Sequence, residues 1–188
     1  IYWMDYGTVV FLSKSDKPIR KPEDVKGKKV RVFGKTLGDF VTALDGVPTL
    51  TSGSEQFLAY QRGTVDAGMT GVGSVKSRKL YEVMDIVTRT EHAKIEFIML
   101  INEGVWNSLS EDEQKVMTEC GLKSEADLRE SIAAIEEDAV QDTLAQGKEV
   151  IEVSDEEREI WKAAAQPVID AYLENSGELG QKVLETLK

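Results

Sequence analysis

Residues 22–32 read PEDVKGKKVRV, which combines a short helical turn with a short strand. Pro22 suits the first position of a helix, where its missing N–H costs nothing. Glu23 and Asp24 follow it and are stabilised by the positive end of the helix dipole. Gly27 then ends the turn. The final VRV alternates in the manner of a strand and puts Arg31 on the face opposite the two valines. The segment therefore predicts one helix–strand unit of an α/β fold.

Arg31 stands at the carboxyl end of this predicted strand. In open α/β sheets, ligands bind outside the carboxyl ends of the strands. A guanidinium there offers a planar fork of donors that matches a carboxylate in two-point geometry, which a lysine cannot do. The structural alternatives are a surface arginine after a strand, or an arginine paired with a nearby acid. This segment alone leaves these alternatives open.

The composition is that of an ordinary globular protein, with 188 residues of which 41% are hydrophobic and 30% charged. No apolar run approaches the ~20 residues that a membrane helix needs. The net charge of −11 is uneven, because residues 1–102 carry 15 Lys and Arg against 12 Asp and Glu, whereas residues 103–188 carry 8 against 22. The second half is therefore a poor partner for nucleic acid or an anionic membrane, and an anionic small ligand is expected in the first half.

Catalytic and metal-binding patterns are missing from the sequence. Cys120 is the only cysteine and His92 the only histidine, so an internal disulfide is excluded and a zinc site is not expected. No nucleophile elbow, Gly-rich phosphate loop or acid/base pair accompanies Arg31. We interpret His92 as a structural residue. The chain begins at Ile1 without an initiator methionine or an apolar signal core, and we expect either a removed targeting segment or an absent N-terminal portion.

Strand and helix patterns alternate along the first half of the chain. A first helix is predicted to start at a capping box of Thr36 and Asp39, and a second helix at Ser54. A third helix is predicted over residues 72–83. The predicted strands are residues 8–13, 30–32, 49–51, 65–69, 85–90 and 95–101. This alternation predicts βαβ units and a partly parallel sheet.

The second half is predominantly helical. Ser110 and Glu113 form a capping box at the start of a long helix, in which Gly121 is the weak point. Ser154 caps a later helix that Pro167 should kink or break. The predicted segments are a helix over residues 110–146, a strand over 149–153 and helices over 155–188.

Five segments, taken in order, resemble the solute-binding proteins of TRAP (tripartite ATP-independent periplasmic) transporters, of the DctP type. They are KPIRKPEDVKGKKVRV, SEQFLAYQRGTVDAG, SRKLYEVMDIVTRTEH, WNSLSEDEQKVM and AAAQPVIDAY, and they cover nearly the whole chain. The resemblance implies an α/β, periplasmic-binding-protein-like fold of two lobes that close on a ligand by a hinge. It also implies that this chain is the C-terminal part of the family pattern, with much of the first lobe absent.

The resemblance divides the chain as follows. Residues 8–91 and 148–153 form the second, ligand-binding lobe. Residues 95–109 return as a strand to the first lobe, and residues 110–146 form a long helix that spans both lobes. Residues 155–188 form the C-terminal helices.

The resemblance also implies a binding site, because it places the family's carboxylate-clamping arginine on Arg31. An aromatic residue two positions later lies on the same face and packs against either the ligand or the lobe core. Met69 and Thr70 end a later strand and are expected to lie near the site. The alternative is that they serve only in packing and in a turn. Glu96 and Phe97 begin the return strand, and one of the two is expected to face the ligand. The candidate substrate-binding residues are Arg31, Phe33, Met69, Thr70, Glu96 and Phe97.

Two departures from the family pattern bear on the ligand. Many members have a further arginine just after the entry into the second lobe, where this chain has Val9, Val10 and Phe11. An asparagine often follows the later strand, where this chain has Thr70. We therefore expect a less polar pocket and, in it, a monocarboxylate with an apolar or aromatic body in place of a sugar acid or a dicarboxylate.

The sequence thus predicts a binding protein, not an enzyme, that captures a small organic acid in the periplasm and delivers it to the membrane subunits of a TRAP transporter. We expect no cofactor, no metal, no nucleic-acid partner and no membrane insertion. Two alternatives stay open at this point: an extracytoplasmic sensor domain with the same fold, and an α/β enzyme that acts on a small anion.

Overall fold

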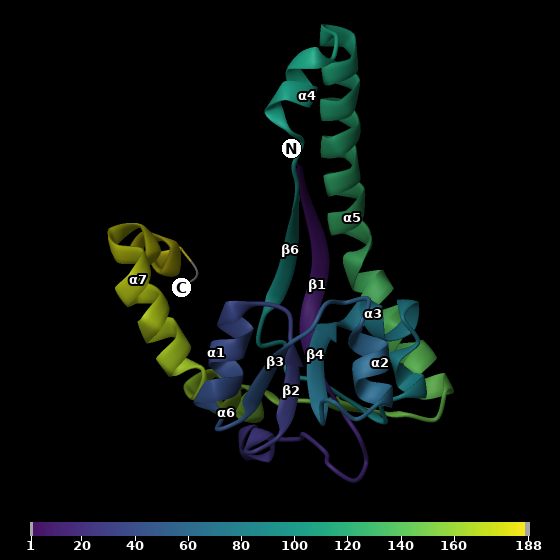
Figure 1. Cartoon of the computed structure of the whole chain (residues 1–188), viewed down its shortest axis with the longest axis vertical. Coiled ribbons are helices and arrows are strands. Elements are labelled where there is room, and N and C mark those ends of the chain that lie inside the picture. The colour runs from purple at the N-terminus through teal and green to yellow at the C-terminus, as the bar shows by residue number, and fades with distance from the viewer. Residues whose placement is uncertain (1, 187–188) are drawn as a thin grey trace.

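The computed structural model describes residues 2–186 and contains one mixed sheet with helices on both faces (Figure 1). The predicted α/β class is therefore confirmed. Across the sheet, the strands follow the order β3 (Val47–Leu50), β2 (Lys29–Val32), β4 (Ala67–Gly71), β1 (Tyr2–Ser13), β5 (Ile86–Arg89) and β7 (Glu149–Glu152). Strand β6 (Lys94–Met99) pairs with β1 off this path.

The sheet is partly parallel, as the alternation of strands and helices predicts. Strand β2 runs parallel to β3 and β4, and β5 runs parallel to β7, whereas β1 is antiparallel to β4, β5 and β6. Helices α1 (Lys35–Ala43) and α2 (Gln56–Gln61) connect the three parallel strands. A 3₁₀ turn, η1 (Pro22–Val25), lies just before β2, where the short helix was expected.

Strand β1 is longer than the strand predicted over residues 8–13. Its second half lies in the centre of the sheet, with Phe11 opposite Met69 of β4 and Thr88 of β5. Its first half leaves the sheet as a two-stranded ribbon with β6. The prediction missed this half because its pairing partner is remote in sequence, and local patterning does not reveal such pairing.

A bulge interrupts the ribbon between Asp5 and Gly7, where the register with β6 shifts. Gly7 has φ +86°, a left-handed conformation that favours glycine, and its N–H donates to the Asp5 carboxylate at 3.0 Å. A Cβ at this position would lie 2.1 Å from a carboxylate oxygen of Glu136. The glycine therefore lets the long helix approach the middle of β1.

That long helix is α5 (Glu111–Ala145), which agrees with the prediction over residues 110–146. Ser110 and Glu113 form the expected capping box. Gly121 does not interrupt the helix, because it is buried where a Cβ would lie 2.6 Å from the Tyr2 ring. The ribbon, α4 (Glu103–Ser108) and the first half of α5 stand together above the sheet (Figure 1).

The C-terminal segment returns to the sheet and then leaves it. Helix α6 (Asp155–Ala164) starts at the capping box of Ser154 and Glu157. The predicted break is present, since α7 (Gln166–Glu185) begins anew with Pro167 in its first turn. Gly177, at φ 57°, kinks α7.

The core consists of two apolar clusters, one on each face of the sheet. Alternation along β1 divides them, because Val9 and Phe11 belong to one cluster and Val10 and Leu12 to the other. Helices α1 and α6 cover the first cluster, and α2, α5 and α3 (Val72–Ser77) cover the second. The largest fully buried apolar side chains include Trp161, Tyr60, Phe11, Leu12, Ile19 and Leu80.

Two predicted helix starts are wrong. Helix α1 begins at Lys35 after an extended Gly34 with no side-chain cap, and Asp39 pairs with Lys35 at 2.6 Å instead of capping with Thr36. Helix α2 follows Glu55, likewise without a side-chain cap. Burial of the apolar faces of these short helices positions them, so the caps suggested by spacing are not used.

The helix predicted over residues 72–83 is divided in two. Helix α3 ends at Ser77, and a 3₁₀ turn, η2 (Leu80–Glu82), follows. Lys79 between them has φ 50°, which a continuous right-handed helix does not allow. Arg78 is the C-cap of α3, so it lies at the break between the two helical segments.

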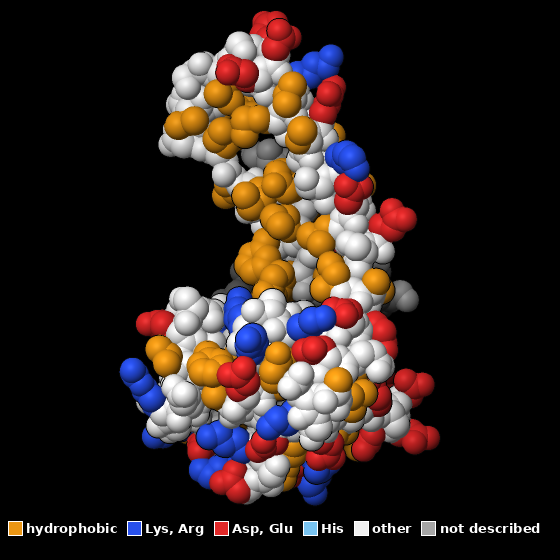
Figure 2. Space-filling view, turned by 90° about the vertical axis from the view of Figure 1, so that its right-hand side faces the viewer, with side chains coloured by type: hydrophobic (Ala, Val, Ile, Leu, Met, Phe, Trp, Pro, Cys, Tyr) orange, Lys and Arg blue, Asp and Glu red, His pale blue; other side chains and the backbone are white. Residues whose placement is uncertain are grey.

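Hydrophobic side chains gather on the concave face of the upper part of the molecule (Figure 2). Most of β6 is exposed, and so is most of the first half of α5. None of the helices described is long and apolar enough to cross a membrane. The exposed large apolar residues in this region are Phe97, Ile98, Met99, Leu100, Val105, Val116, Met117 and Leu122.

Candidate functional site

A cavity of about 440 Å³ lies where the β1–β6 ribbon meets the carboxyl ends of the parallel strands. Strand β2 with the residue after it, the loop after β3, the end of β4, the end of α3 and both strands of the ribbon contribute to its wall. Among residues 2–186, no Asp or Glu lines it. The lining residues are Tyr6, Arg31, Phe33, Leu50, Thr51, Ser52, Gly53, Thr70, Arg78, Ile95 and Phe97.

Arg31 lies at the base of this cavity and is only 2% exposed. Its Nε donates to the Thr51 carbonyl at 3.0 Å, and its Nη1 donates to the Met69 carbonyl at 2.7 Å. These bonds fix the plane of the guanidinium. Its Nη2 makes no hydrogen bond to the described part of the chain, and this atom is not completely buried. Both N–H groups of Nη2 therefore remain for a ligand.

Both structural alternatives for Arg31 are wrong. The side chain is not on the surface, and no carboxylate of residues 2–186 pairs with it. Burial lowers the pKa of Arg31 below its usual range, although an arginine stays protonated in a protein. Burial also raises the pKa of the nearby Tyr60 to about 12, so this phenol is neutral and does not compensate the charge. A buried cation without a counter-charge favours an anionic ligand.

Aromatic side chains form the rest of the wall around Arg31. The Phe33 ring lies 5.1 Å from the guanidinium carbon of Arg31, a cation–π contact. Tyr6 and Phe97, on the two strands of the ribbon, meet edge to face at 5.0 Å between ring centroids. The cavity thus pairs one charged end with an apolar side.

Arg78 is a second arginine of this cavity, and the sequence analysis missed it. Its Nη1 donates to the Gln56 side-chain carbonyl at 3.1 Å, and its Nη2 donates to the Tyr6 hydroxyl at 3.4 Å. Its positive charge also lowers the pKa of Arg31, after the larger effect of burial. The one signal in the sequence was the RK pair at residues 78–79, inside the third helix pattern, which does not by itself indicate a side chain turned toward the cavity.

The structure brings four of the six predicted site residues together at one cavity: Arg31, Phe33, Thr70 and Phe97. Met69 does not line it, because its side chain is fully buried in the core and only its carbonyl meets Arg31. Glu96 turns away and pairs with Arg129 of α5 at 3.3 Å. Phe97 is therefore the cleft-facing member of that pair.

The expectation of a less polar pocket is only half right. Val9, Val10 and Phe11 are fully buried core residues, so that part of β1 contributes no arginine. Arg78 brings a second positive charge from α3 instead. Sequence comparison at the expected position could not reveal a cation supplied by another element.

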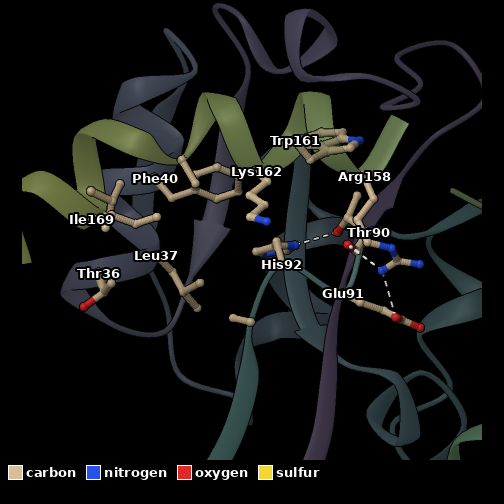
Figure 3. Close-up of a pocket in the computed structure, with 13 residues that line it drawn as sticks. Thr36, Leu37, Phe40, Thr90, Glu91, His92, Arg158, Trp161, Lys162 and Ile169 are labelled. Carbon is tan, nitrogen blue, oxygen red and sulfur yellow. Dashed lines mark hydrogen bonds and ion pairs between the residues drawn. The ribbon is translucent and has the colours of Figure 1, made fainter. Parts of the chain in front are cut away.

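A second cavity, of about 390 Å³, lies between α1, α6, α7 and the segment after β5 (Figure 3). Its wall is mainly apolar, and its charges are compensated: Arg158 pairs with Glu91 at 2.8 Å and Lys162 with Glu159 at 3.4 Å. It therefore lacks the free charge that would select an ionic ligand.

His92 belongs to this apolar cluster and not to a catalytic site. Its ring lies 5.0 Å from Phe11 and 5.1 Å from Phe40, and its Nδ1 lies 2.5 Å from the Thr90 hydroxyl (Figure 3). Burial lowers the pKa of His92 to about 3, so the imidazole is neutral near pH 7. The structural interpretation of His92 agrees with these contacts.

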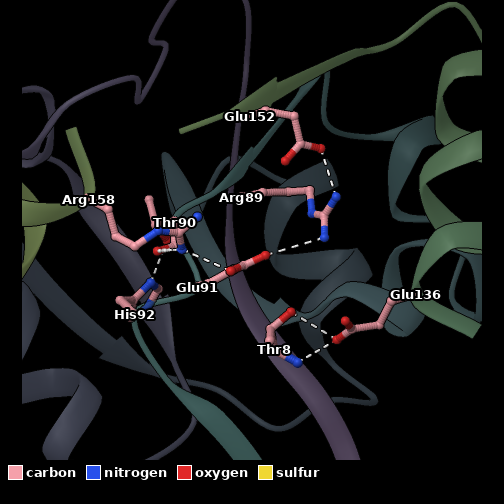
Figure 4. A network of polar contacts seen from close by, with 8 residues as sticks. All are labelled: Thr8, Arg89, Thr90, Glu91, His92, Glu136, Glu152 and Arg158. Atoms are coloured by element: carbon pink, nitrogen blue, oxygen red, sulfur yellow. Dashed lines mark hydrogen bonds and ion pairs between the residues drawn. The ribbon is translucent and has the colours of Figure 1, made fainter. Parts of the chain in front are cut away.

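Polar contacts join β5, the segment that follows it, β7 and α6 (Figure 4). Arg89 bridges Glu152 at 2.7 Å and Glu91 at 3.3 Å, and Glu91 also pairs with Arg158. Within residues 2–186, no group of three or more His, Cys, Asp or Glu side chains could hold a metal ion. The network joins elements of the fold and leaves the Arg31 cavity as the candidate site.

Fold and cavity together describe an α/β protein with a cationic pocket for a small anion, and comparison with known proteins gives its family. Residues 1–175 match DctP, "Bacterial extracellular solute-binding protein, family 7". The chain belongs to this family, the solute-binding proteins of TRAP transporters, which are not enzymes. The resemblance found in the sequence is thereby confirmed.

Individual relatives are similar at low identity. The ectoine-binding periplasmic protein TeaA of Halomonas elongata is 28% identical over 177 residues, which are 93% of this chain and 52% of TeaA. The sialic acid-binding periplasmic protein SiaP of Vibrio cholerae is 28% identical over 174 residues, 92% of this chain and 52% of SiaP. The chain thus spans about half the length of the curated relatives it matches.

Solved structures agree with the fold. The ectoine-binding protein of H. elongata superposes with a TM-score of 0.86 at 26% identity, over 97% of this chain and 59% of that protein. A TRAP solute-binding protein of Roseobacter denitrificans with bound β-D-glucuronate gives a TM-score of 0.83 at 29% identity, over 93% and 57%. A mixed sheet with a long helix is thus the shared architecture.

Proposed function

We propose that this protein captures a small organic acid outside the cytoplasm, in the periplasm, and delivers it to the membrane subunits of a TRAP transporter. The observation that carries the proposal is Arg31, a buried cation in a cavity that no acidic residue of the described part of the chain lines. Its two backbone hydrogen bonds hold the guanidinium still, and its Nη2 is left for a carboxylate.

The ligands of relatives support an acid. Relatives are described as binding C4-dicarboxylates and sialic acid, and solved relatives hold orotic acid and glucuronate. Since each relative is about a quarter identical to this chain, these names indicate the chemical class and not the ligand. Phe33, Ile95 and Phe97 would contact the carbon body of such an acid.

The proposal includes the division into lobes. Residues 8–91 and 148–153 would form the ligand-binding second lobe, and residues 95–109 and 110–146 would carry the chain to and across a first lobe. The exposed apolar side chains on β6, α4 and the first half of α5 support this, because apolar surface of that extent usually faces a partner. Residues 155–188 would pack as C-terminal helices, as α6 and α7 do here as far as residue 186.

Binding of acids by the full-length protein tests the proposal. A thermal-shift screen against small organic acids comes first, since a ligand at ~100 times its dissociation constant stabilises a protein by ~2.7 kcal/mol. Calorimetric titration of the acids found would then compare the wild type with Arg31→Ala. We expect Arg31→Ala to lose most of the affinity. Unchanged affinity in the folded variant, or no binding of any acid by the wild type, would contradict the proposal.

A further inference from the structure

We infer that Arg78 is a specificity-determining residue that binds a second anionic group of the ligand, opposite the carboxylate held by Arg31. The inference rests on the proposed function and adds a ligand class to it: acids with two negative groups, in place of the monocarboxylate that the departures from the family pattern led us to expect. Arg78 and Arg31 line the same cavity from different elements, the end of α3 and strand β2.

The arginine is held in place by neutral groups only. Gln56 accepts from its Nη1 and the Tyr6 hydroxyl accepts from its Nη2, and no carboxylate of residues 2–186 pairs with it. The Gln56 amide also donates to Tyr60 at 2.7 Å and to the Met69 carbonyl at 3.4 Å. Because Met69 also accepts from Arg31, one chain of hydrogen bonds ties the two guanidiniums to each other.

Gly53 makes room for this arginine. A Cβ on Gly53 would lie 2.7 Å from both Nη atoms of Arg78. Gly53 does not have a positive φ, so the backbone there does not itself require a glycine. The absent side chain is what allows the guanidinium to lie over the loop and line the cavity.

Charge balance then gives the ligand class. The part of the cavity wall that the described residues form contains two guanidiniums and no carboxylate, and the positive charge of Arg78 lowers the pKa of Arg31. Two like charges in a partly dry site repel each other until anions compensate both. A ligand with two anionic groups compensates both, whereas a monocarboxylate leaves one cation unpaired.

Calorimetric titration of the full-length protein with matched acids tests the inference. The probes are succinate with butyrate, glutarate with pentanoate, and phthalate with benzoate, so each pair differs by one carboxylate. Charge-assisted hydrogen bonds predict that Arg78→Gln weakens the diacids about ten- to hundredfold and the monoacids less than about threefold. Arg31→Ala should weaken both members of a pair. Arg62→Ala, which removes an exposed arginine of the same lobe, is the control and should change neither.

Gly53→Ala supplies an independent variant that keeps both arginines. Its Cβ should displace the Arg78 guanidinium and weaken the diacids at least about fivefold, in line with one distorted charged hydrogen bond. The same change in the Arg78→Gln background should then have no further effect, because the two residues act as one unit.

Separate outcomes would overturn the inference and the proposed function. If Arg78→Gln leaves the ratio of diacid to monoacid affinity unchanged while Arg31→Ala weakens both acids, the inference is wrong and the proposed function stands. Binding of monoacids but of no diacid by the wild type has the same meaning. If Arg31→Ala weakens neither acid, the proposed function fails as well.

Discussion

Glu136 of α5 accepts two hydrogen bonds from Thr8 of β1, one from the backbone N–H and one from the hydroxyl at 2.9 Å (Figure 4). Thr8 follows the bulge at which β1 leaves the central sheet. The carboxylate therefore joins the long helix to the strand at the point where the ribbon begins.

Glu136→Ala should lower the free energy of unfolding by about 1–3 kcal/mol, because the Thr8 N–H and hydroxyl lose their acceptor in a partly buried place. Urea denaturation measures this. Glu137→Ala is the matched control, since Glu137 is exposed and accepts a hydrogen bond from Gln141 on its own helix. Equal effects of the two substitutions would show that the contact to Thr8 contributes nothing.

Arg31→Ala should reduce the affinity for an organic acid by roughly thirty- to several-thousandfold, since a buried charged group that loses its partner costs ~2 to 5 kcal/mol. Arg31→Lys should recover only part of the loss, because an ammonium lacks the planar fork. The Thr51 and Met69 carbonyls also lose a donor, so we expect Arg31→Ala to destabilise the fold by about 1–3 kcal/mol as well. Titrations must therefore be run where denaturation curves show a folded variant.

His92 should make stability depend on pH. Its folded pKa, about 3, lies below the ordinary value of 6.5, so the unfolded chain binds more protons between these values. Its contribution is complete above pH 6.5 and is lost as the pH falls toward 3, at most about 1.4 kcal/mol per pH unit. We expect His92→Phe, which keeps a ring beside Phe11 and Phe40, to remove this component. Urea denaturation at pH 7 and pH 4.5 gives the free energy of unfolding of both proteins. An equal change of this free energy between the two pH values in wild type and His92→Phe would contradict the assignment.

Val116 and Ile160 test whether the apolar face of α5 is covered in the full-length protein. Here both are exposed helical residues, at 57% and 54%. If a first lobe packs on α5, Val116→Ser should lower the free energy of unfolding by about 1–3 kcal/mol. Ile160→Ser, the control on α6, should stay within about 0.5 kcal/mol. A Val116 effect as small as the control would argue against a covering lobe.

Local signals predicted the elements of this fold well where short-range chemistry determines them. The Ser110 and Ser154 capping boxes and the break before Pro167 lie where spacing indicates, because each depends on residues within a few positions. The first half of β1 and the division after Ser77 were missed, because the one depends on a remote strand and the other on a left-handed residue, Lys79.

The site was predictable only in part for the same reason. Arg31 stands at a strand end that sequence alone marks as a place for ligands. Arg78 reaches the cavity only because α3 ends early and because Gly53, in another loop, has no side chain. Neither condition is visible in a window around Arg78.

The division of β1 between sheet and ribbon places natural fluorophores at opposite ends of the molecule. Trp3 lies in the ribbon at 46% exposure, whereas Trp161 is in the core of the sheet region at 2%. Tyr6, which lies in the bulge, is a β1 residue that lines the cavity. A ligand that moves Tyr6 would therefore change the fluorescence emission of the exposed Trp3 indole, whereas the emission of the buried Trp161 indole would stay constant. With Trp106 and Trp161 both replaced by phenylalanine, Trp3 would be the remaining tryptophan, and its fluorescence could follow motion of the ribbon.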